Sequence, residues 1–239
     1  MFIKHEPDNC LLLHRAFAEW TELHSKKHRA VAFVDPDEFI VLHRHRTISE
    51  LLEEVLYPFG GALGINWTMF GSNGLEGYDP RPVTQRFTRR EARDNPHVKS
   101  IVVCADLAGM VNPHFPRLLG GALQRDTGGK VFEGPFNPHG PLDVAQLNHY
   151  WFKSYPEWLI KRNKGHVDID VAERGLRRLS MFADGDEHSN AVEDDSAWRF
   201  YRRLLESKEA ADAGELAEAP QQQQKAGAIP VDVSLFLSA

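Results

Sequence analysis

The sequence predicts an α/β fold in which a mixed sheet is flanked by helices. Helical patterns at residues 8–28 and 47–57 stand on either side of an apolar run of strand length at 30–34. Further strand-like segments follow at 63–70 and 98–103. Helices and strands that alternate along the chain are typical of α/β proteins. The unbroken apolar run is typical of a strand covered on both faces of its sheet.

Composition places the chain among ordinary globular proteins. It has 239 residues, 42% hydrophobic and 26% charged, with a net charge of −6. A negative balance of this kind argues against a nucleic-acid partner. We find no signal peptide and no membrane-spanning run, so a cytoplasmic location, or a peripheral one at a membrane, is expected. Cys10 and Cys104 are too few for a disulfide framework or a zinc site and are expected to be reduced, buried thiols.

The ordered domain is expected to cover residues 1–205. It opens with the 8–28 helix, whose apolar face carries residues at helical spacing: Leu13, Phe17, Trp20 and Leu23. The 47–57 helix has Ser49 as a candidate N-cap. Residues 206–239 are expected to form a low-complexity tail that is disordered or weakly helical, because they combine an Ala/Glu stretch with a run of glutamines at 221–224.

Strands are expected at 63–70, 83–87, 98–103 and 144–147. The last of these follows a long Pro- and Gly-rich loop at 112–141, which is expected to contain a short hairpin. Ser154, Pro156 and Glu157 form the start of a helix over 155–164, and Gly165 ends it. A further helix is expected at 170–181 and an acidic loop at 183–196. The last short helix is expected at 197–205.

Two carboxylates follow the first strand directly, in the sequence Asp35-Pro36-Asp37. Ligands of open α/β sheets bind beyond the carboxyl ends of the strands. An Asp-x-Asp at such an end can hold a hard divalent cation, whose remaining positions go to water and a diphosphate. The alternative is a plain turn, because Asp-Pro-Asp is good turn chemistry and acidic residues after a strand usually face water.

Three separated segments together resemble one enzyme family. They are residues 33–39 around the Asp-x-Asp, residues 66–74 (Asn-Trp-Thr-Met-Phe-Gly-Ser-Asn-Gly), and residues 149–154 (His-Tyr-Trp-Phe-Lys-Ser) continuing to Lys161 and Gly165. In this order and spacing they resemble the family 92-type glycosyltransferases and their bacterial relatives in the broad family-2-like group. The resemblance covers roughly residues 9–168, and the Lys99 segment and His114 also look like lesser family positions.

The resemblance implies a GT-A-like fold and the transfer of a sugar from a nucleotide-sugar donor to a glycan or another hydroxyl acceptor. It implies Mn²⁺ or Mg²⁺ at the Asp-x-Asp (DXD) motif, with Asp37 as first choice for direct ligation and Asp35 binding directly or through water. His149 would be the third ligand, since imidazole suits manganese. The alternative for His149 is a structural histidine among aromatic side chains.

Substrate contacts are expected from five residues. Lys153 would neutralise a phosphate, Trp67 and Phe70 would stack on a sugar ring, and Gly71 and Ser72 would let the backbone approach the acceptor. Each has a simpler alternative: a surface lysine, core aromatic rings and an ordinary turn.

An inverting reaction needs a general base that takes the proton of the acceptor hydroxyl. Glu76 and Asp79 lie in the loop after the aromatic strand and are the candidates. The alternative is that both are exposed loop carboxylates without a role in catalysis.

One departure from the family concerns the start of the chain. A nucleotide-binding βαβ half is expected before the Asp-x-Asp strand, yet only about thirty residues precede it, too few for a parallel crossover plus its strands. An N-terminally truncated GT-A-like domain is therefore expected. It would expose one flank of its sheet and so favour self-association. The alternative functions are a non-catalytic remnant or interaction module and, less well supported, a phosphohydrolase with Asp35 as nucleophile.

Overall fold

The structure, a computed structural model, describes residues 9–93, 95–164 and 176–212. The elements are, in chain order, α1 (Asn9–His24), the 3-10 turn η1 (Ser25–Lys27), β1 (Ala30–Ala32), β2 (Glu38–Leu42), α2 (Ile48–Leu51), the π-helical turn η2 (Leu52–Leu56), β3 (Ala62–Met69), α3 (Val83–Arg86), β4 (Arg89–Arg90), β5 (Val98–Val103), the 3-10 turn η3 (Cys104–Asp106), β6 (Leu107–Asn112), β7 (Phe115–Leu118), β8 (Gln124–Asp126), β9 (Ala145–His149), α4 (Tyr155–Asn163), α6 (Ser180–His188), β10 (Val192–Glu193) and α7 (Ser196–Asp212).

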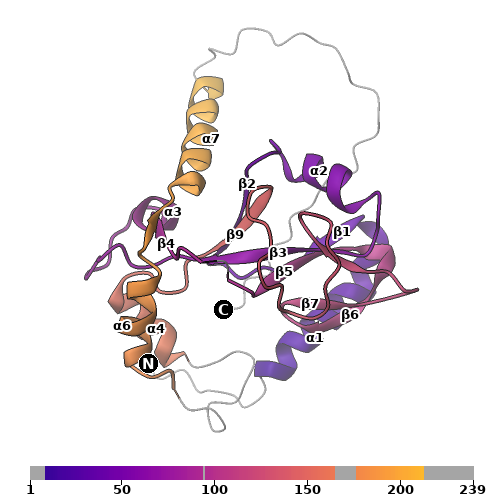
Figure 1. The fold of residues 1–239 in the computed structure, drawn as a ribbon, viewed down its shortest axis with the longest axis horizontal. Helices are drawn as coiled ribbons and strands as arrows, with labels where there is room; N and C mark the ends of the chain where they lie inside the picture. Colours follow the sequence, from indigo (N-terminus) through magenta and orange to yellow (C-terminus); the bar gives the residue numbers. More distant parts are fainter. Residues whose placement is uncertain (1–8, 94, 165–175, 213–239) are drawn as a thin grey trace.

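A mixed sheet forms the centre of the molecule (Figure 1). Its order is β1-β5-β3-β9-β2, with β8 paired to the first half of β3 and β9 to the second half. β3 runs parallel to β8 and β9, whereas β1–β5, β3–β5 and β2–β9 are antiparallel. The mixed α/β architecture expected from the sequence is confirmed, and β3 and β5 lie close to their expected positions.

The two faces of the sheet are covered by different elements. On one face α2 and η2 bury their leucines against β3, β5 and β9. On the other face Val102 of β5 packs against Leu107 of the β6–β7 hairpin, while α1 packs Phe17 and Trp20 against Phe33. Both faces of β1 are therefore covered, as its apolar run predicts, and its partial exposure comes from its place at the edge of the sheet.

Two details of the N-terminal helices differ from expectation. Leu23 is 53% exposed, so the packed face of α1 ends at Trp20. The N-cap of α2 is Thr47 rather than Ser49. Thr47 has the extended backbone of a cap, with φ −136° and ψ 157°, and its hydroxyl oxygen accepts the Glu50 N–H.

The predicted strand at 83–87 is wrong, because this segment is the short helix α3. Pro82 precedes it, and the Phe87 N–H donates to the Val83 carbonyl at 3.1 Å. The apolar residues Val83 and Phe87 are four apart and join one cluster with Phe70 and Tyr150. A spacing of four fits one face of a helix, which explains why alternation misled the prediction.

The predicted acidic loop at 183–196 is also wrong, because α6 covers 180–188 and β10 covers 192–193. Phe182 anchors α6 by ring contacts with Phe152, Tyr155 and Trp158. Helix α7 extends the predicted 197–205 helix to Asp212. Gly165 and residues 170–175 of the predicted 170–181 helix lie outside the described residues. The rest of that prediction is wrong at 176–179, which are not helical, while 180–181 belong to α6.

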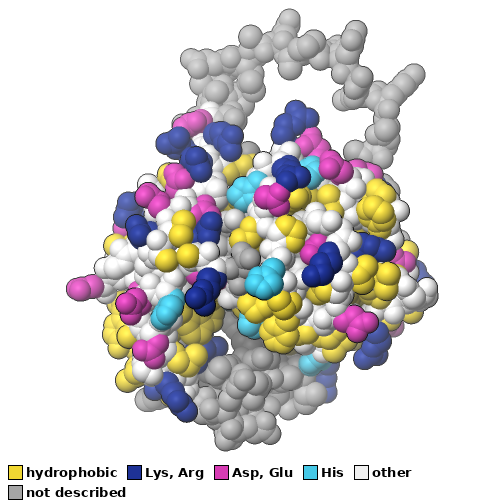
Figure 2. Space-filling model, in the orientation of Figure 1, with side chains coloured by type: hydrophobic (Ala, Val, Ile, Leu, Met, Phe, Trp, Pro, Cys, Tyr) yellow, Lys and Arg dark blue, Asp and Glu magenta, His cyan; other side chains and the backbone are white. Residues whose placement is uncertain are grey.

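No helix in the described part of the chain is both long enough and apolar enough to cross a bilayer. On the face drawn in Figure 2, basic and acidic side chains lie among one another. Cys104 is a buried free thiol, as expected, and burial raises its pKa to about 11.

Candidate functional site

The acidic turn between β1 and β2 is held by two reciprocal hydrogen bonds. The Glu38 N–H donates to the Asp35 carbonyl at 2.9 Å, and Glu38 Oε2 accepts the Asp35 N–H at 2.8 Å. Pro36 occupies the middle of this turn, where its fixed φ is favourable. The turn separates the two aspartates, because Asp35 faces β5 and Asp37 faces the segment that leads into α4.

Asp35 meets a buried lysine. Lys99 Nζ lies 3.1 Å from Asp35 Oδ2 and 3.4 Å from Glu38 Oε2. The side chain of Lys99 is 4% exposed and that of Glu38 is 0% exposed, whereas that of Asp35 is 51% exposed. Burial raises the pKa of Glu38 to about 7, against the opposing effect of Lys99. Glu38 is thus a buried side chain that fixes the turn.

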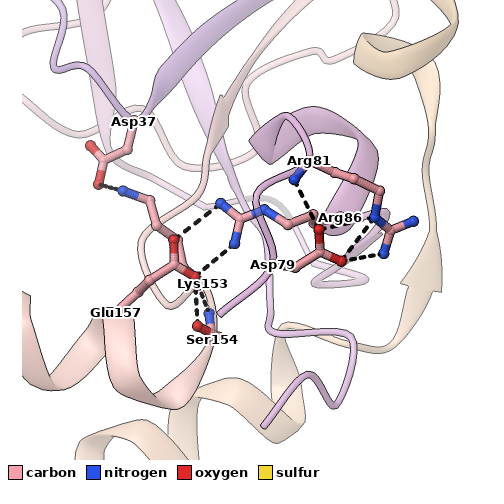
Figure 3. A network of polar contacts seen from close by, with 7 residues as sticks. All are labelled: Asp37, Asp79, Arg81, Arg86, Lys153, Ser154 and Glu157. Atoms are coloured by element: carbon pink, nitrogen blue, oxygen red, sulfur yellow. Dashed lines mark hydrogen bonds and ion pairs between the residues drawn. The ribbon is translucent and has the colours of Figure 1, made fainter. Parts of the chain in front are cut away.

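Asp37 lies at the meeting point of one imidazole and two ammonium groups. Its Oδ2 is 2.9 Å from Lys161 Nζ and 3.4 Å from Lys153 Nζ, and its Oδ1 is 3.7 Å from His149 Nε2. Figure 3 shows the Lys153 contact. Burial alone would raise the pKa of Asp37, but the ammonium groups of Lys161 and Lys153 outweigh it and hold that pKa well below its usual range. Asp37 is therefore ionised.

His149 is a neutral, buried imidazole beside that carboxylate. Burial lowers its pKa well below the usual value, although Asp37 opposes the shift. Its Nδ1 is buried and makes no hydrogen bond to the described residues. The ring packs edge-on against Trp67, with centroids 4.3 Å apart. A carboxylate and a neutral imidazole side by side are a donor pair that divalent transition metals bind.

Two lysines reach Asp37 from different backbone settings. Lys153 has a left-handed backbone, with φ +55°, immediately before the Ser154 cap of α4. Lys161 projects from α4, with its Nζ 5.1 Å from the centroid of the Trp151 ring. Burial lowers the pKa of Lys161, and the contact with Asp37 opposes that effect. A non-glycine residue at positive φ is strained and is often found at functional sites.

Helix α4 is fixed in place by a buried ion pair. Arg86 of α3 donates to both oxygens of Glu157, at 2.8 and 3.0 Å, and Ser154 donates to the same carboxylate from its N–H and its hydroxyl (Figure 3). The side chains of Arg86 and Glu157 are 7% and 16% exposed. This network sets the position of α4 and therefore of Lys161.

The two predicted bases lie in the loop between β3 and α3. The backbone N–H and the guanidinium of Arg81 donate to the Asp79 carboxylate, with a shortest N–O distance of 2.6 Å. These hydrogen bonds lower the pKa of Asp79. The carboxylate points toward Arg81, away from Asp37 (Figure 3). Glu76 is exposed. Neither residue joins the polar contacts around Asp37 described above.

The predicted substrate residues fall into two groups. Trp67 lies beside His149, yet one of its faces is stacked on His97 with centroids 4.8 Å apart. Phe70 is fully buried in the core, at 0% exposure, and presents no face to a ligand in this structure.

The turn after β3 binds α6. Ser72 donates from its N–H and hydroxyl to Asp186, at 2.5 and 2.6 Å. A Cβ on Gly71 would lie 2.5 Å from the Asn190 side chain, so this glycine allows close packing. Here Gly71 and Ser72 contribute to the join between β3 and α6.

The predicted metal ligands are brought together only in part. Asp37 and His149 are neighbours, but Asp35 is turned to Lys99. In residues 9–93, 95–164 and 176–212 no three His, Cys, Asp or Glu side chains form a group that could share one ion. Asp37 and His149 fit a divalent cation as a donor pair. The two lysines now neutralise Asp37 and would have to yield space to such an ion.

Lys161 and Lys99 were given no role by the sequence interpretation, although the family resemblance included both positions. Lys161 follows Glu157 by four residues on α4, a spacing that places both on one helix face. Lys99 lies inside an otherwise buried strand, where a lysine needs a charged partner. That signal could have paired Lys99 with the acidic turn.

No protein-family model and no curated protein matches this chain.

Proposed function

We propose that this chain is a metal-dependent glycosyltransferase with a GT-A-like fold, or the acceptor-side part of one. It would transfer a sugar from a nucleotide-sugar donor to a glycan or another hydroxyl acceptor. The observation that carries the proposal is the convergence on Asp37 of His149, Lys153 and Lys161, at 3.7, 3.4 and 2.9 Å. These groups come from a segment more than a hundred residues away, and the resemblance names the same positions.

The proposed roles follow from charge. In glycosyl transfer the leaving group is a nucleoside diphosphate, and negative charge grows on its β-phosphate as the glycosidic bond breaks. Asp37 and His149 would hold Mn²⁺ or Mg²⁺, which supplies Lewis-acid stabilisation of that charge when bound. Lys153 and Lys161 would turn from Asp37 to the phosphate oxygens. Each lysine would then keep a charge-assisted hydrogen bond, because a phosphate oxygen is an anionic acceptor like the Asp37 carboxylate.

The remaining residues have supporting roles in this proposal. Glu38 and Lys99 keep the acidic turn in shape, and Asp35 faces solvent beside them, where it can contact the donor directly or through water. Trp67 holds the His149 ring. Glu76 is the better candidate for the base, because Arg81 lowers the proton affinity of Asp79. A cytoplasmic setting, or a peripheral one at a membrane, and self-association through the open flank beside β1 belong to the same proposal.

One observation favours a second candidate, a non-catalytic remnant or interaction module. The two lysines already neutralise Asp37, so the centre is satisfied without a ligand. In that case Asp37 would stabilise the join between the acidic turn and α4.

Nucleoside diphosphate release from a panel of nucleotide-sugars in Mn²⁺ tests the proposal. We expect Asp37→Asn to lower the rate at least 100-fold, because the variant keeps the shape and loses the charge. The matched control is Asp143→Asn, an exposed carboxylate paired with Arg44, and it should keep the wild-type rate. If no nucleotide-sugar is turned over and no nucleoside diphosphate binds to the wild-type chain, the second candidate is favoured.

A further inference from the structure

An apolar groove of about 750 Å³ runs along the outer edge of β2. Four successive residues, from Phe39 to Leu42, line it. Because successive side chains of a strand point to opposite faces, a groove that touches four in a row lies along the strand's edge. The other walls come from α3, from the start of α2 and from the first turns of α7, which stands beside β2 (Figure 1): Arg46, Thr47, Ile48, Pro82, Val83, Thr84, Ala197, Phe200 and Tyr201.

The backbone of β2 is available on this side. The backbone carbonyl of Asp37 accepts the Tyr150 N–H at 2.9 Å, and the His43 N–H donates to the Val144 carbonyl at 3.0 Å. The odd-numbered residues of this stretch therefore direct their backbone N–H and C=O groups to β9. In an antiparallel pair the alternate residues point the other way. Ile40 and Leu42 therefore direct their N–H and C=O groups to the open edge. Within the described part of the chain, no strand pairs with that edge.

The chain itself contains a segment with the matching pattern. Residues 231–237 read Val-Asp-Val-Ser-Leu-Phe-Leu, which places four aliphatic residues on one face of a strand: Val231, Val233, Leu235 and Leu237. Pro230 precedes them, and proline is tolerated at the first position of an edge strand. The segment carries a single charge, Asp232, so it suits a groove with few polar groups.

Chain connectivity allows this segment to reach the groove. Helix α7, which forms one wall, is the element from which residues 213–239 continue. From Tyr201 in the groove to Asp212 at the helix end is roughly 17 Å at the rise of an α-helix. Residues 213–229 can span roughly 55 Å when extended, so they can turn back along α7 to β2.

We propose that residues 231–237 dock in this groove of the same molecule and add a strand to the open edge of β2. The added strand would bond to the outward backbone groups of Ile40 and Leu42, and its aliphatic face would cover apolar groove side chains such as Phe200. An exposed edge strand can pair with another chain. A strand supplied by the same molecule would occupy the edge of β2 and prevent such pairing there. This inference is independent of the proposed enzymatic function.

Amide hydrogen exchange at Ile40 and Leu42 tests the proposal in the full-length chain. We expect slow exchange at both amides in the wild type. Exchange should become at least tenfold faster in the double variant Val233→Asp/Leu235→Asp, because two buried charges would prevent docking. Ser238→Asp adds a charge just outside the segment and should leave the exchange slow. None of these substitutions changes a residue of the buried core clusters described above, so unfolding of the domain is not expected.

Two results would overturn the proposal. One is equal exchange at Ile40 and Leu42 in the wild type and the double variant. The other is protection that grows with protein concentration, together with a doubled mass in light scattering, because the groove would then hold the segment of a second copy.

Discussion

At the scale of single residues, the centre of the molecule is a carboxylate whose charge is fixed by its surroundings. Asp37 is 13% exposed, and burial without partners would favour its neutral form. The ammonium groups of Lys161 and Lys153 reverse that preference. The pKa of Glu38, the next residue, is raised instead, because its burial outweighs the effect of Lys99. Neighbouring carboxylates with pKa values pushed apart are characteristic of functional sites.

The raised pKa of Glu38 predicts a pH-dependent stability. Folding raises this pKa from 4.5 to about 7, so the folded state binds the proton more tightly than the unfolded chain. The resulting stabilisation is complete below pH 4.5 and is lost as the pH rises to about 7. In Glu38→Gln, the difference in melting temperature between pH 5 and pH 8 should shrink by about 3 °C or more. An unchanged difference in thermal denaturation would show that Glu38 does not titrate in this range.

The candidate site could be predicted from the sequence in part. The sequence singled out Asp35, Asp37, His149 and Lys153, and three of these do meet. It also treated Asp35 and Asp37 as one ligand pair, whereas the structure turns them to different partners. Which way a carboxylate points after a turn depends on the cations supplied by distant strands and helices. Local sequence contains little information about those partners, as the unassigned Lys99 and Lys161 show.

At the scale of elements, helix α4 connects the network around Asp37 to the rest of the molecule. Its start was predictable, because Ser154, Pro156 and Glu157 are strong local signals. The position of α4 in the molecule was not predictable. Glu157 also forms an ion pair with Arg86, a distant residue, and the local signals of the helix start do not indicate that partner. The same holds for α3, where tertiary packing of Val83 and Phe87 produced a helix in place of the expected strand. β5, by contrast, matched its prediction residue for residue, because four of its six residues are β-branched and aliphatic, which favours a strand.

Removal of Arg86 should reveal how strongly this ion pair holds α4. Arg86→Ala leaves the Glu157 carboxylate buried without its bidentate partner, and we expect a loss of about 3 kcal/mol in the free energy of unfolding. The control is Arg81→Ala, which removes a partly exposed pair with Asp79 and should leave the denaturation midpoint nearly unchanged. Equal stability of the two variants in urea denaturation would contradict a positioning role for Arg86.

At the scale of the whole molecule, the acidic turn connects β1 and β2, the first and last strands of the order β1-β5-β3-β9-β2. β1 ends before Asp35, and β2 begins at Glu38 on the other side of the sheet. The turn therefore crosses from one end of this strand order to the other, and His149 contacts it from β9, the neighbour of β2. This topology explains why residues far apart in sequence can act on one carboxylate.

The most direct test of the Asp37 centre is the electron paramagnetic resonance of Mn²⁺ in the presence of a nucleoside diphosphate and the full chain. We predict that the wild-type chain removes more of the free Mn²⁺ signal than the nucleotide does alone, and that Asp37→Asn and His149→Ala each abolish this difference while Asp143→Asn retains it. A free Mn²⁺ signal that the wild-type chain leaves unchanged, or that Asp37→Asn reduces equally, would contradict cation binding at Asp37.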